Sequence, residues 1–415
     1  MFKRLLPAGG MALFRAAEKM PRNGDQFFAF RQQSDFFYLS GIEQENAVLM
    51  IFPDHPDTNM RELLFIEAYS AVKEIWEGHV LTTAEASAIS GIERVLTHEQ
   101  FESALRDAMH AASRVFLNTY EYPKYHPEAE SVQHRFARSV KKSFPLHDYQ
   151  RSAPLLENLR MIKSPAETAL IAEACRITGE GFEQLLRCVR PGMYEFEAEA
   201  EITRIFGLNR ANGHGYQPII AGGKNACTLH YSDNASKLED GALLLLDFGA
   251  EYANYTADLS RTIPVNGRFS PRQLQCYQAV LRVFKSAVKL YVPGNTIGQI
   301  NESVWLMMQD EMIGLGLFTA EDVRKQSPSD PLYKKYLMHG VAHHIGLDVH
   351  DAGSKYVPLQ PGMVLSCEPG LYIRHENIGI RIENDLLVTD GEPVDLMKNI
   401  PLEAEEIESL MNFKL

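Results

Sequence analysis

The chain has 415 residues, of which 45% are hydrophobic and 23% are charged. This length and composition are typical of a folded protein with two domains and exclude a disordered chain. The 41 basic and 54 acidic residues give a net charge of −13. That balance argues against nucleic acid or an anionic membrane surface as a partner, because either would need a basic face. No apolar stretch approaches the ~18 residues of a membrane-spanning helix.

The cysteines and the N-terminal residues indicate the cellular compartment of the protein. The cysteines are odd in number and widely spaced, and they lie at positions 175, 188, 227, 276 and 367. A disulfide framework is therefore not expected, which favours a reducing compartment. The run Leu5–Phe14 follows Lys3 and Arg4 as in a signal peptide, but Pro7 and two glycines interrupt it. We expect a cytoplasmic protein.

The first 150 residues carry a mixed α/β pattern. Short apolar or alternating runs predict strands at Gln26–Phe30, Ala47–Phe52, Leu63–Ile66 and Val115–Asn118. Amphipathic runs predict helices at Thr83–Ser90, His98–Ala112 and Ala129–Lys142.

A polar stretch flanked by prolines, Pro145–Pro154, predicts a linker after this region. A new helix is predicted from Ser164, because Ser164, Pro165 and Glu167 form the pattern of an N-cap, a first-turn proline and a capping box. We therefore expect an N-terminal mixed α/β domain over residues 1–155 and a second domain over residues 156–415.

The second domain contains an internal duplication. The pattern Leu-x-x-Gly-x5-acid-x-Gly occurs at residues 238–249 and again at residues 359–370. Upstream of each copy, a long amphipathic helix ends before a Pro-Gly pair; the two helices are predicted at Ala166–Val189 and Arg272–Tyr291. These matched landmarks predict a duplicated domain with a pseudo-two-fold axis rather than a solenoid.

The duplication places acids at equivalent positions in both halves. Asp247 and Glu368 each follow an apolar run that predicts a buried strand, and Asp258 and Glu383 lie in the β-rich segments that come next. A pseudo-axis would bring all four carboxylates to one centre. Four converging carboxylates cannot all ionise without cations, so we expect two divalent metal ions.

A histidine-rich segment, His339–Asp351, supplies a nitrogen ligand, and His339 and His343 share a face of it. One imidazole with four carboxylates makes an oxygen-rich site that favours Mn²⁺, with Zn²⁺, Co²⁺ and Fe²⁺ as competitors. Two such ions lower the pKa of water and polarise a carbonyl group.

Four segments together resemble the pita-bread metallopeptidases, the family of methionine aminopeptidase, aminopeptidase P and prolidase; they are Leu243–Ile263, His339–Asp351, Ser366–Ile373 and Gly379–Asp385. The resemblance implies a C-terminal pita-bread domain. It also implies the metal ligands Asp247, Asp258, His343, Glu368 and Glu383, with Asp258 and Glu383 shared between two ions.

The finer resemblance is to the proline-specific branch, through Gly346–Asp351 and the triplet Arg381–Glu383. In the first domain, Arg31–Gly41 and Glu74–Gly78 closely resemble the N-terminal domain of bacterial aminopeptidase P. This implies release of the N-terminal residue from peptides with proline in second position. A prolidase restricted to dipeptides is the alternative within the family, and a non-catalytic binding protein of the same fold is a more distant one.

The resemblance implies catalytic roles for five residues. Glu368 would act as general base and then as general acid. His230 and His350 would contact the substrate, and His339 would donate to the tetrahedral intermediate or to the peptide carbonyl. Arg381 would orient the carboxylates or the substrate, with a plain internal ion pair as its alternative.

Three further residues are implied in substrate binding. Tyr372 would line the pocket or would be a half-buried core residue. Asp35 and Trp76 come from the first domain, which in this family closes one end of the cleft, and a tryptophan of a neighbouring subunit can reach in. The resemblance thus implies a homodimer or homotetramer. The alternative for Trp76 is a core residue of its own domain.

Overall fold

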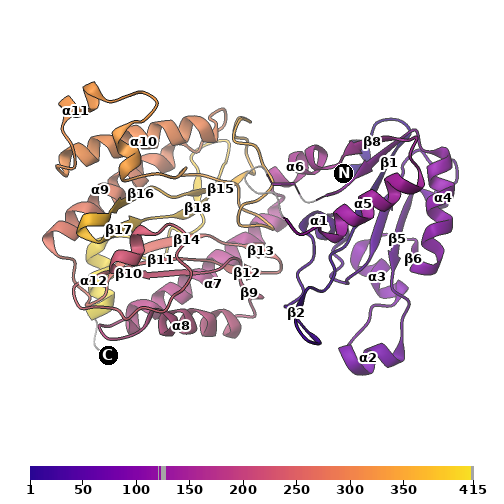
Figure 1. Ribbon diagram of the computed structural model, residues 1–415, viewed down its shortest axis with the longest axis horizontal. Coiled ribbons are helices and arrows are strands. Elements are labelled where there is room, and N and C mark those ends of the chain that lie inside the picture. The colour runs from indigo at the N-terminus through magenta and orange to yellow at the C-terminus, as the bar shows by residue number, and fades with distance from the viewer. Residues whose placement is uncertain (120, 123–127, 413–415) are drawn as a thin grey trace. The chain divides into compact units, whose positions relative to one another are not determined.

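A computed structural model describes residues 1–119, 121–122 and 128–412. The chain divides into two compact units, Met1–Leu159 and Arg160–Leu415 (Figure 1). The division falls within one helix, α6 (Ala153–Met161), a few residues after the predicted boundary at 155/156. Helices and sheets occur in both units, so the predicted mixed α/β class is confirmed.

The first unit is built on one six-stranded sheet with the strand order β6-β5-β4-β1-β7-β8. Its strands are β1 (Gly10–Arg15), β4 (Val48–Ile51), β5 (Glu62–Ile66), β6 (Val95–Thr97), β7 (Arg114–Leu117) and β8 (Asp148–Arg151). The central strand β1 pairs antiparallel with β4 and parallel with β7. The apolar run that was compared with a signal peptide therefore supplies a buried strand of the sheet.

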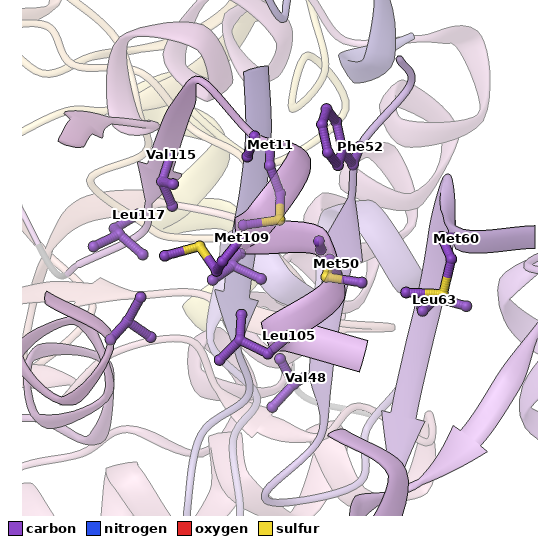
Figure 2. Packing of buried hydrophobic residues seen from close by; sticks show 14 of the residues in the cluster. Met11, Val48, Met50, Phe52, Met60, Leu63, Leu105, Met109, Val115 and Leu117 are labelled. Carbon is purple, nitrogen blue, oxygen red and sulfur yellow. The ribbon is translucent and has the colours of Figure 1, made fainter. Parts of the chain in front are cut away.

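Both faces of this sheet are buried, because its strands alternate their side chains between two hydrophobic clusters. β1 places Met11 and Leu13 in one cluster and Ala12 and Phe14 in the other, as the two-residue period of a strand requires. Figure 2 shows the first cluster, to which Leu105, Met109 and their neighbours on α4 (Phe101–Ala111) contribute. α5 (Val132–Ser143) packs on the same face.

The second face is covered by α1 (Ser34–Ser40), α3 (Thr83–Ser90) and α6. α3 begins and ends at the predicted residues, whereas the strand predicted at Gln26–Phe30 is shorter. The remaining elements are η1 (Phe2–Arg4), β2 (Pro21–Asn23), β3 (Gln26–Phe27), η2 (Thr58–Met60), α2 (Ala71–Glu77) and η3 (His98–Gln100).

The predicted linker Pro145–Pro154 is wrong. Its middle part is the edge strand β8, which pairs in parallel with β7, and its last residues begin α6. Tyr149 of β8 packs against the first cluster and donates a hydrogen bond of 2.6 Å to the Phe144 carbonyl. The other residues of β8 are exposed, which is why the segment lacks an apolar pattern.

Trp76 is not a core residue. It lies on α2, a helix without buried residues, and 84% of its surface is exposed. The alternative interpretation of Trp76 is therefore wrong, and its role has to be sought outside its own hydrophobic core.

The second unit repeats one helical pattern twice. In the first half, α7 (Pro165–Cys188) starts at the predicted capping box and is followed by α8 (Glu195–Leu208). In the second half, α9 (Pro271–Ala287) and η5 (Val288–Leu290) are followed by α10 (Ile297–Gly314). The unit also contains α11 (Ala320–Lys325), η6 (Leu332–Lys335) and α12 (Ala404–Asn412). None of the helices in the described part of the chain has both the length and the apolar character needed to span a membrane.

The strands repeat as well. A turn glycine in the left-handed region, Gly241 (φ 74°) or Gly362 (φ 91°), precedes a buried strand in each half. These strands, β11 (Leu243–Phe248) and β15 (Val364–Cys367), pair antiparallel with β14 (Leu259–Pro264) and β18 (Asn384–Leu387). The other elements are β9 (Gly213–His214), β10 (Ile219–Gly222), η4 (Gly223–Cys227), β12 (Ala250–Tyr252), β13 (Tyr255–Thr256), β16 (Gly370–Ile373), η7 (Arg374–Glu376), β17 (Ile378–Arg381) and β19 (Val394–Asp395).

The two halves meet where β14 lies beside the turn between β17 and β18. The Glu383 amide donates to the Ser260 carbonyl at 3.0 Å. The buried guanidinium of Arg261 donates from Nη1 to both of these residues, at 2.9 Å to the Ser260 carbonyl and 2.7 Å to the Glu383 carbonyl. This junction brings acids from both halves into one place.

Candidate metal centre and active site

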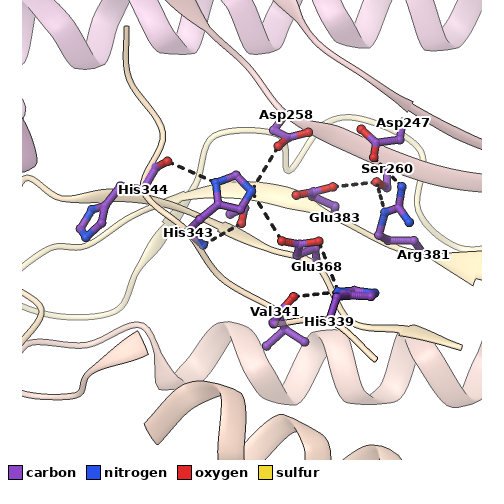
Figure 3. A network of polar contacts seen from close by, with 12 residues as sticks. Asp247, Asp258, Ser260, His339, Val341, His343, His344, Glu368, Arg381 and Glu383 are labelled. Atoms are coloured by element: carbon purple, nitrogen blue, oxygen red, sulfur yellow. Dashed lines mark hydrogen bonds and ion pairs between the residues drawn. The ribbon is translucent and has the colours of Figure 1, made fainter. Parts of the chain in front are cut away.

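The four duplicated acids lie at or next to the ends of paired strands of the second unit, and Figure 3 shows them close together. Asp247 is in β11 and Asp258 directly precedes β14. Glu368 directly follows β15, and Glu383 lies in the short connection between β17 and β18. Each half thus contributes two carboxylates, one from each strand of its pair.

Three residues offer ligand atoms that all lie within 4.8 Å of one another: Asp258, His343 and Glu383. Glu368 is close to the same imidazole, since His343 Nε2 lies 3.5 Å from Glu368 Oε1 and 3.4 Å from Asp258 Oδ2. The other ring nitrogen, Nδ1, lies 3.2 Å from the His344 carbonyl, which leaves Nε2 directed at the acids. His344 itself is buried and points away from them in Figure 3.

The carboxylates of this centre have too little positive charge around them to offset their own negative charge. Burial, followed by the neighbouring acids, raises the pKa of Glu383 well above its ordinary value. Burial also raises the pKa of Glu368 to about 7, and it raises the pKa of Asp258. Within the described residues, Glu383 Oε1 is buried without a hydrogen-bond partner. An orphaned oxygen among desolvated acids fits a site for divalent cations, and the donor set of carboxylates with one imidazole suits such ions.

Tyr216 is a member of this centre that the sequence did not reveal. Its hydroxyl lies 2.6 Å from Asp247 Oδ1 and 2.5 Å from Asp258 Oδ1. Burial and these two acids raise the pKa of Tyr216 well above its ordinary value, so the phenol keeps its proton. It holds the two carboxylates of the first half beside each other.

Arg381 connects the two halves of the centre. Its Nη2 forms an ion pair with Asp247 Oδ2, and its Nε donates at 2.8 Å to Ser260 Oγ. The Ser260 hydroxyl in turn donates at 2.6 Å to Glu383 Oε2. Arg381 therefore forms the internal ion pair that was its alternative, and it also orients a second carboxylate through Ser260. Ser260, like Tyr216, had no signal in the sequence.

His339 and Tyr372 continue this network. Tyr372 is buried, and its hydroxyl accepts from Arg381 Nη1 at 2.7 Å and lies 2.8 Å from His339 Nε2. Burial and Arg381 lower the pKa of His339 to about 4, so the ring is neutral. Its Nδ1 lies 2.7 Å from the Gly340 carbonyl and carries the proton, because a carbonyl only accepts. The hydroxyl of Tyr372 then donates to Nε2.

His350 and His230 lie at the exposed side of the centre. The His350 ring packs edge-on against the His343 ring, with 4.5 Å between centroids. The His230 side chain is near enough to His339 for its charge to contribute to the lowered pKa of His339, after burial and Arg381. Both residues are exposed, as substrate contacts have to be.

The loop that carries His343 and His350 is anchored by a buried ion-pair cluster at Asp351. Lys163 Nζ donates at 2.9 Å to Asp351 Oδ2, and Arg160 Nη2 pairs with Asp351 Oδ1. Burial opposes ionisation of this carboxyl, but the two cations outweigh it and lower the pKa of Asp351 to about 2. The cluster fixes the C-terminal end of the histidine-rich segment.

Asp35 and Trp76 belong to the first unit. Asp35 is in the first turn of α1, and its Oδ2 accepts from Gln33 Nε2 at 3.1 Å and from Asn118 Nδ2 at 3.2 Å. It therefore links α1 to the residue that follows β7.

The chain is similar to known proteins over its whole length. The family model described as metallopeptidase family M24 matches residues 169–390, and the model described as the aminopeptidase P N-terminal domain matches residues 1–116. The Xaa-Pro aminopeptidase of Haemophilus influenzae is 34% identical over 100% of this chain and 95% of its own. That of Escherichia coli is 32% identical over 97% and 94%. The low-pH form of E. coli aminopeptidase P matches with a TM-score of 0.89 and 30% identity, over 99% of this chain and 96% of that one.

The fold and the acid-rich centre define a metal-dependent peptidase, and the chain belongs to metallopeptidase family M24. Its N-terminal domain and its full-length relatives make it an aminopeptidase P type of the pita-bread fold. The family resemblance drawn from the sequence is confirmed, and the chain is a hydrolase.

Proposed function

We propose that the enzyme releases the N-terminal residue from peptides whose second residue is proline. The observation that carries this is the cluster of Asp258, His343 and Glu383, with Glu368 beside the same imidazole, in a chain that aligns over its whole length with an Xaa-Pro aminopeptidase. One solved E. coli aminopeptidase P structure is a variant in complex with substrate, and another is a zinc-substituted form in complex with product.

We propose two divalent metal ions per chain, with Mn²⁺ preferred over Zn²⁺, Co²⁺ and Fe²⁺ because the donor atoms are mostly hard oxygens. The proposed ligands are Asp247, Asp258, His343, Glu368 and Glu383, with Asp258 and Glu383 shared. Such ions, when bound, supply a lowered pKa of water and polarisation of the scissile carbonyl.

The scissile bond of an Xaa-Pro peptide is a tertiary amide, so the proline nitrogen must gain a proton before it leaves. Glu368 is proposed to take a proton from the attacking water and to deliver it to this nitrogen. His339 Nδ1 lies 3.6 Å from Glu368 Oε2, so a neutral imidazole borders the path of that proton. To donate to the substrate, His339 has to release its bond to the Gly340 carbonyl.

Five residues are proposed to shape the substrate site around this chemistry. Tyr372 and Arg381 are fixed in the buried network and orient their neighbours, whereas His230 and His350 are exposed and would contact the peptide. Asp35 is proposed to act from the N-terminal unit, where the family closes one end of the cleft.

A direct assay separates this function from its alternatives. The Mn²⁺-loaded enzyme is expected to hydrolyse both Gly-Pro-Pro and Gly-Pro, with the tripeptide preferred, and Gly-Ala-Pro serves as the control substrate without penultimate proline. Cleavage of Gly-Pro alone would instead show a prolidase. Absence of bound metal and of any cleavage after incubation with Mn²⁺ would favour a non-catalytic binding protein.

We propose a homodimer or homotetramer and a cytoplasmic location. The location rests on the state of the thiols, since all five cysteines are free and none forms a disulfide. The assembly rests on Trp76, an exposed tryptophan on a helix that exposes further apolar surface at Val72 and Ile75.

Trp76→Ala tests the assembly. We expect weaker subunit association or a raised KM, because an anchor tryptophan at an interface is often worth about 2 kcal/mol or more. Thermal stability of the N-terminal unit should not change, because the side chain is exposed. Sedimentation measures subunit association, steady-state kinetics measure KM, and thermal unfolding measures Tm. Leu146→Ala, which removes another highly exposed apolar side chain of the same unit, is the control. Unchanged assembly and unchanged KM in Trp76→Ala would contradict the proposal.

A further inference from the structure

A buried carboxylate outside the metal centre holds the loop that carries His230. Glu195 is the first residue of α8, and none of its surface is exposed. Burying a carboxylate costs free energy unless its oxygens accept hydrogen bonds. The hydrogen-bond partners of Glu195 therefore indicate its role.

The Glu195 carboxylate accepts hydrogen bonds from both ends of the segment 222–236. Oε1 accepts from the Gly222 amide at 2.7 Å and from Asn225 Nδ2 at 3.0 Å. Oε2 accepts from the Tyr231 hydroxyl at 2.7 Å and from the Ser236 amide at 2.8 Å. The two oxygens thus have separate tasks, since one holds the start of the segment and the other holds its end.

His230 directly precedes Tyr231 in this segment, and its own side chain is exposed. The opposite side of the segment packs on β17. Cys227 Sγ donates to the Ile378 carbonyl at 3.4 Å, and a Cβ at Gly379 would lie 2.2 Å from the Ala226 carbonyl oxygen. β17 ends at Arg381, so the segment is fixed between Glu195 and the strand that leads into the metal centre.

We propose that Glu195 is a positioning residue, which sets His230 at the substrate site by holding both ends of its loop. Hydrogen bonds to an ionised acceptor are stronger than neutral ones, and four of them on one carboxylate restrict the loop more than packing of its polar surface could. The inference rests on the proposed function through the role of His230 as a substrate contact.

The experiment compares Glu195→Gln with Glu197→Gln, in the wild type and in a His230→Ala background, using Gly-Pro-Pro as the substrate. Glu197 is the matched control. It lies in the same helical turn, where Oε2 accepts from the Tyr194 amide at 2.7 Å, and the same substitution there leaves the loop contacts in place. Tyr231→Phe removes only one of the four bonds, and it serves as the second variant if Glu195→Gln does not fold.

We expect Glu195→Gln to lower kcat/KM about tenfold, mainly through KM, because small displacements of a positioning group cost this much or more. Tyr231→Phe should show a smaller change in the same direction. Metal content should be unchanged in both, and Glu197→Gln should behave as wild type. In the His230→Ala background neither variant should lower kcat/KM further, because the group that they position is gone.

Two results would overturn the inference, and they differ in what else they affect. If Glu195→Gln lowers kcat/KM by the same factor with and without His230, Glu195 does not act through His230, and the proposed function is untouched. If His230→Ala alone leaves kcat/KM unchanged, the proposed substrate role of His230 fails together with this inference, whereas hydrolysis of Gly-Pro-Pro by the wild type still supports the peptidase.

Discussion

Replacing Asp258 by alanine is expected to abolish activity and to remove at least one metal ion per chain. Asp258 is buried, and its carboxylate lies between His343 and Tyr216 at the meeting point of the two halves. A ligand shared by two ions serves both, so its loss weakens both. Thermal stability should also fall, because losing bound ions removes their stabilisation of the folded state and leaves the other carboxylates repelling one another. Elemental analysis, kcat and Tm measure the three effects.

The control for this variant is Asp240→Ala. Asp240 is an exposed aspartate of the same unit that accepts a hydrogen bond from Asn266, and its removal should change none of the three quantities. Retention of two ions per chain in Asp258→Ala would refute the shared role of Asp258, even if activity were lost.

Glu368→Gln is expected to lower kcat by about 10²–10⁴-fold, the usual contribution of a general acid–base group, with metal content and fold retained. Glutamine keeps an oxygen for coordination but cannot accept a proton and give it back. The backbone of Glu368 is fixed independently of its side chain, since its amide donates at 3.0 Å to the Val341 carbonyl. Pre-steady-state and steady-state turnover of Gly-Pro-Pro, at measured metal occupancy, test this.

Glu376→Gln provides the same substitution in the turn between β16 and β17, where Glu376 pairs with Arg272 at 2.7 Å. It should leave kcat unchanged. A change in kcat of less than about twofold in Glu368→Gln, far below the range for a proton-transfer group, would show that another residue moves the proton.

The four acids could be located from the sequence because the internal duplication marks them with a repeated local pattern, whereas the family resemblance singles out His343 within the histidine-rich segment. A glycine turn and an apolar run place Asp247 and Glu368 at equivalent points, and the antiparallel pairing of β11 with β14 and of β15 with β18 then brings the second acid of each half near the first. In a strand pair the register is fixed by the buried face. Repetition of the pattern was therefore enough to predict a common centre.

Tyr216 and Ser260 could not be located in this way. Tyr216 reaches Asp247 and Asp258 across 31 and 42 residues of chain, and it follows the two-residue strand β9, which has no apolar periodicity. Ser260 meets Glu383 across 123 residues. The Tyr216 contacts arise from the folding of the first half, and the Ser260 contact arises from the packing of the two halves against each other; no spacing along the chain encodes either.

The edge strand β8 was missed for a different reason. A strand is recognised by the alternation of buried and exposed residues, but only Tyr149 of β8 is even partly buried. Its place in the sheet depends on backbone hydrogen bonds to β7, which any sequence can make. The flanking prolines then suggested a linker.

The ion pairs of Asp351 limit where a fragment containing only the second unit can begin. The M24 family match begins at residue 169, yet both cations that neutralise Asp351 lie before it, Arg160 at the end of α6 and Lys163 just beyond. A fragment that began at residue 169 would bury the Asp351 carboxylate without its two cations. Its free energy of unfolding would fall by about 3–5 kcal/mol, the usual cost of breaking a buried ion pair. The buried ion-pair cluster therefore extends upstream of the residues that the M24 family model matches, and a fragment that keeps it has to begin at or before Arg160.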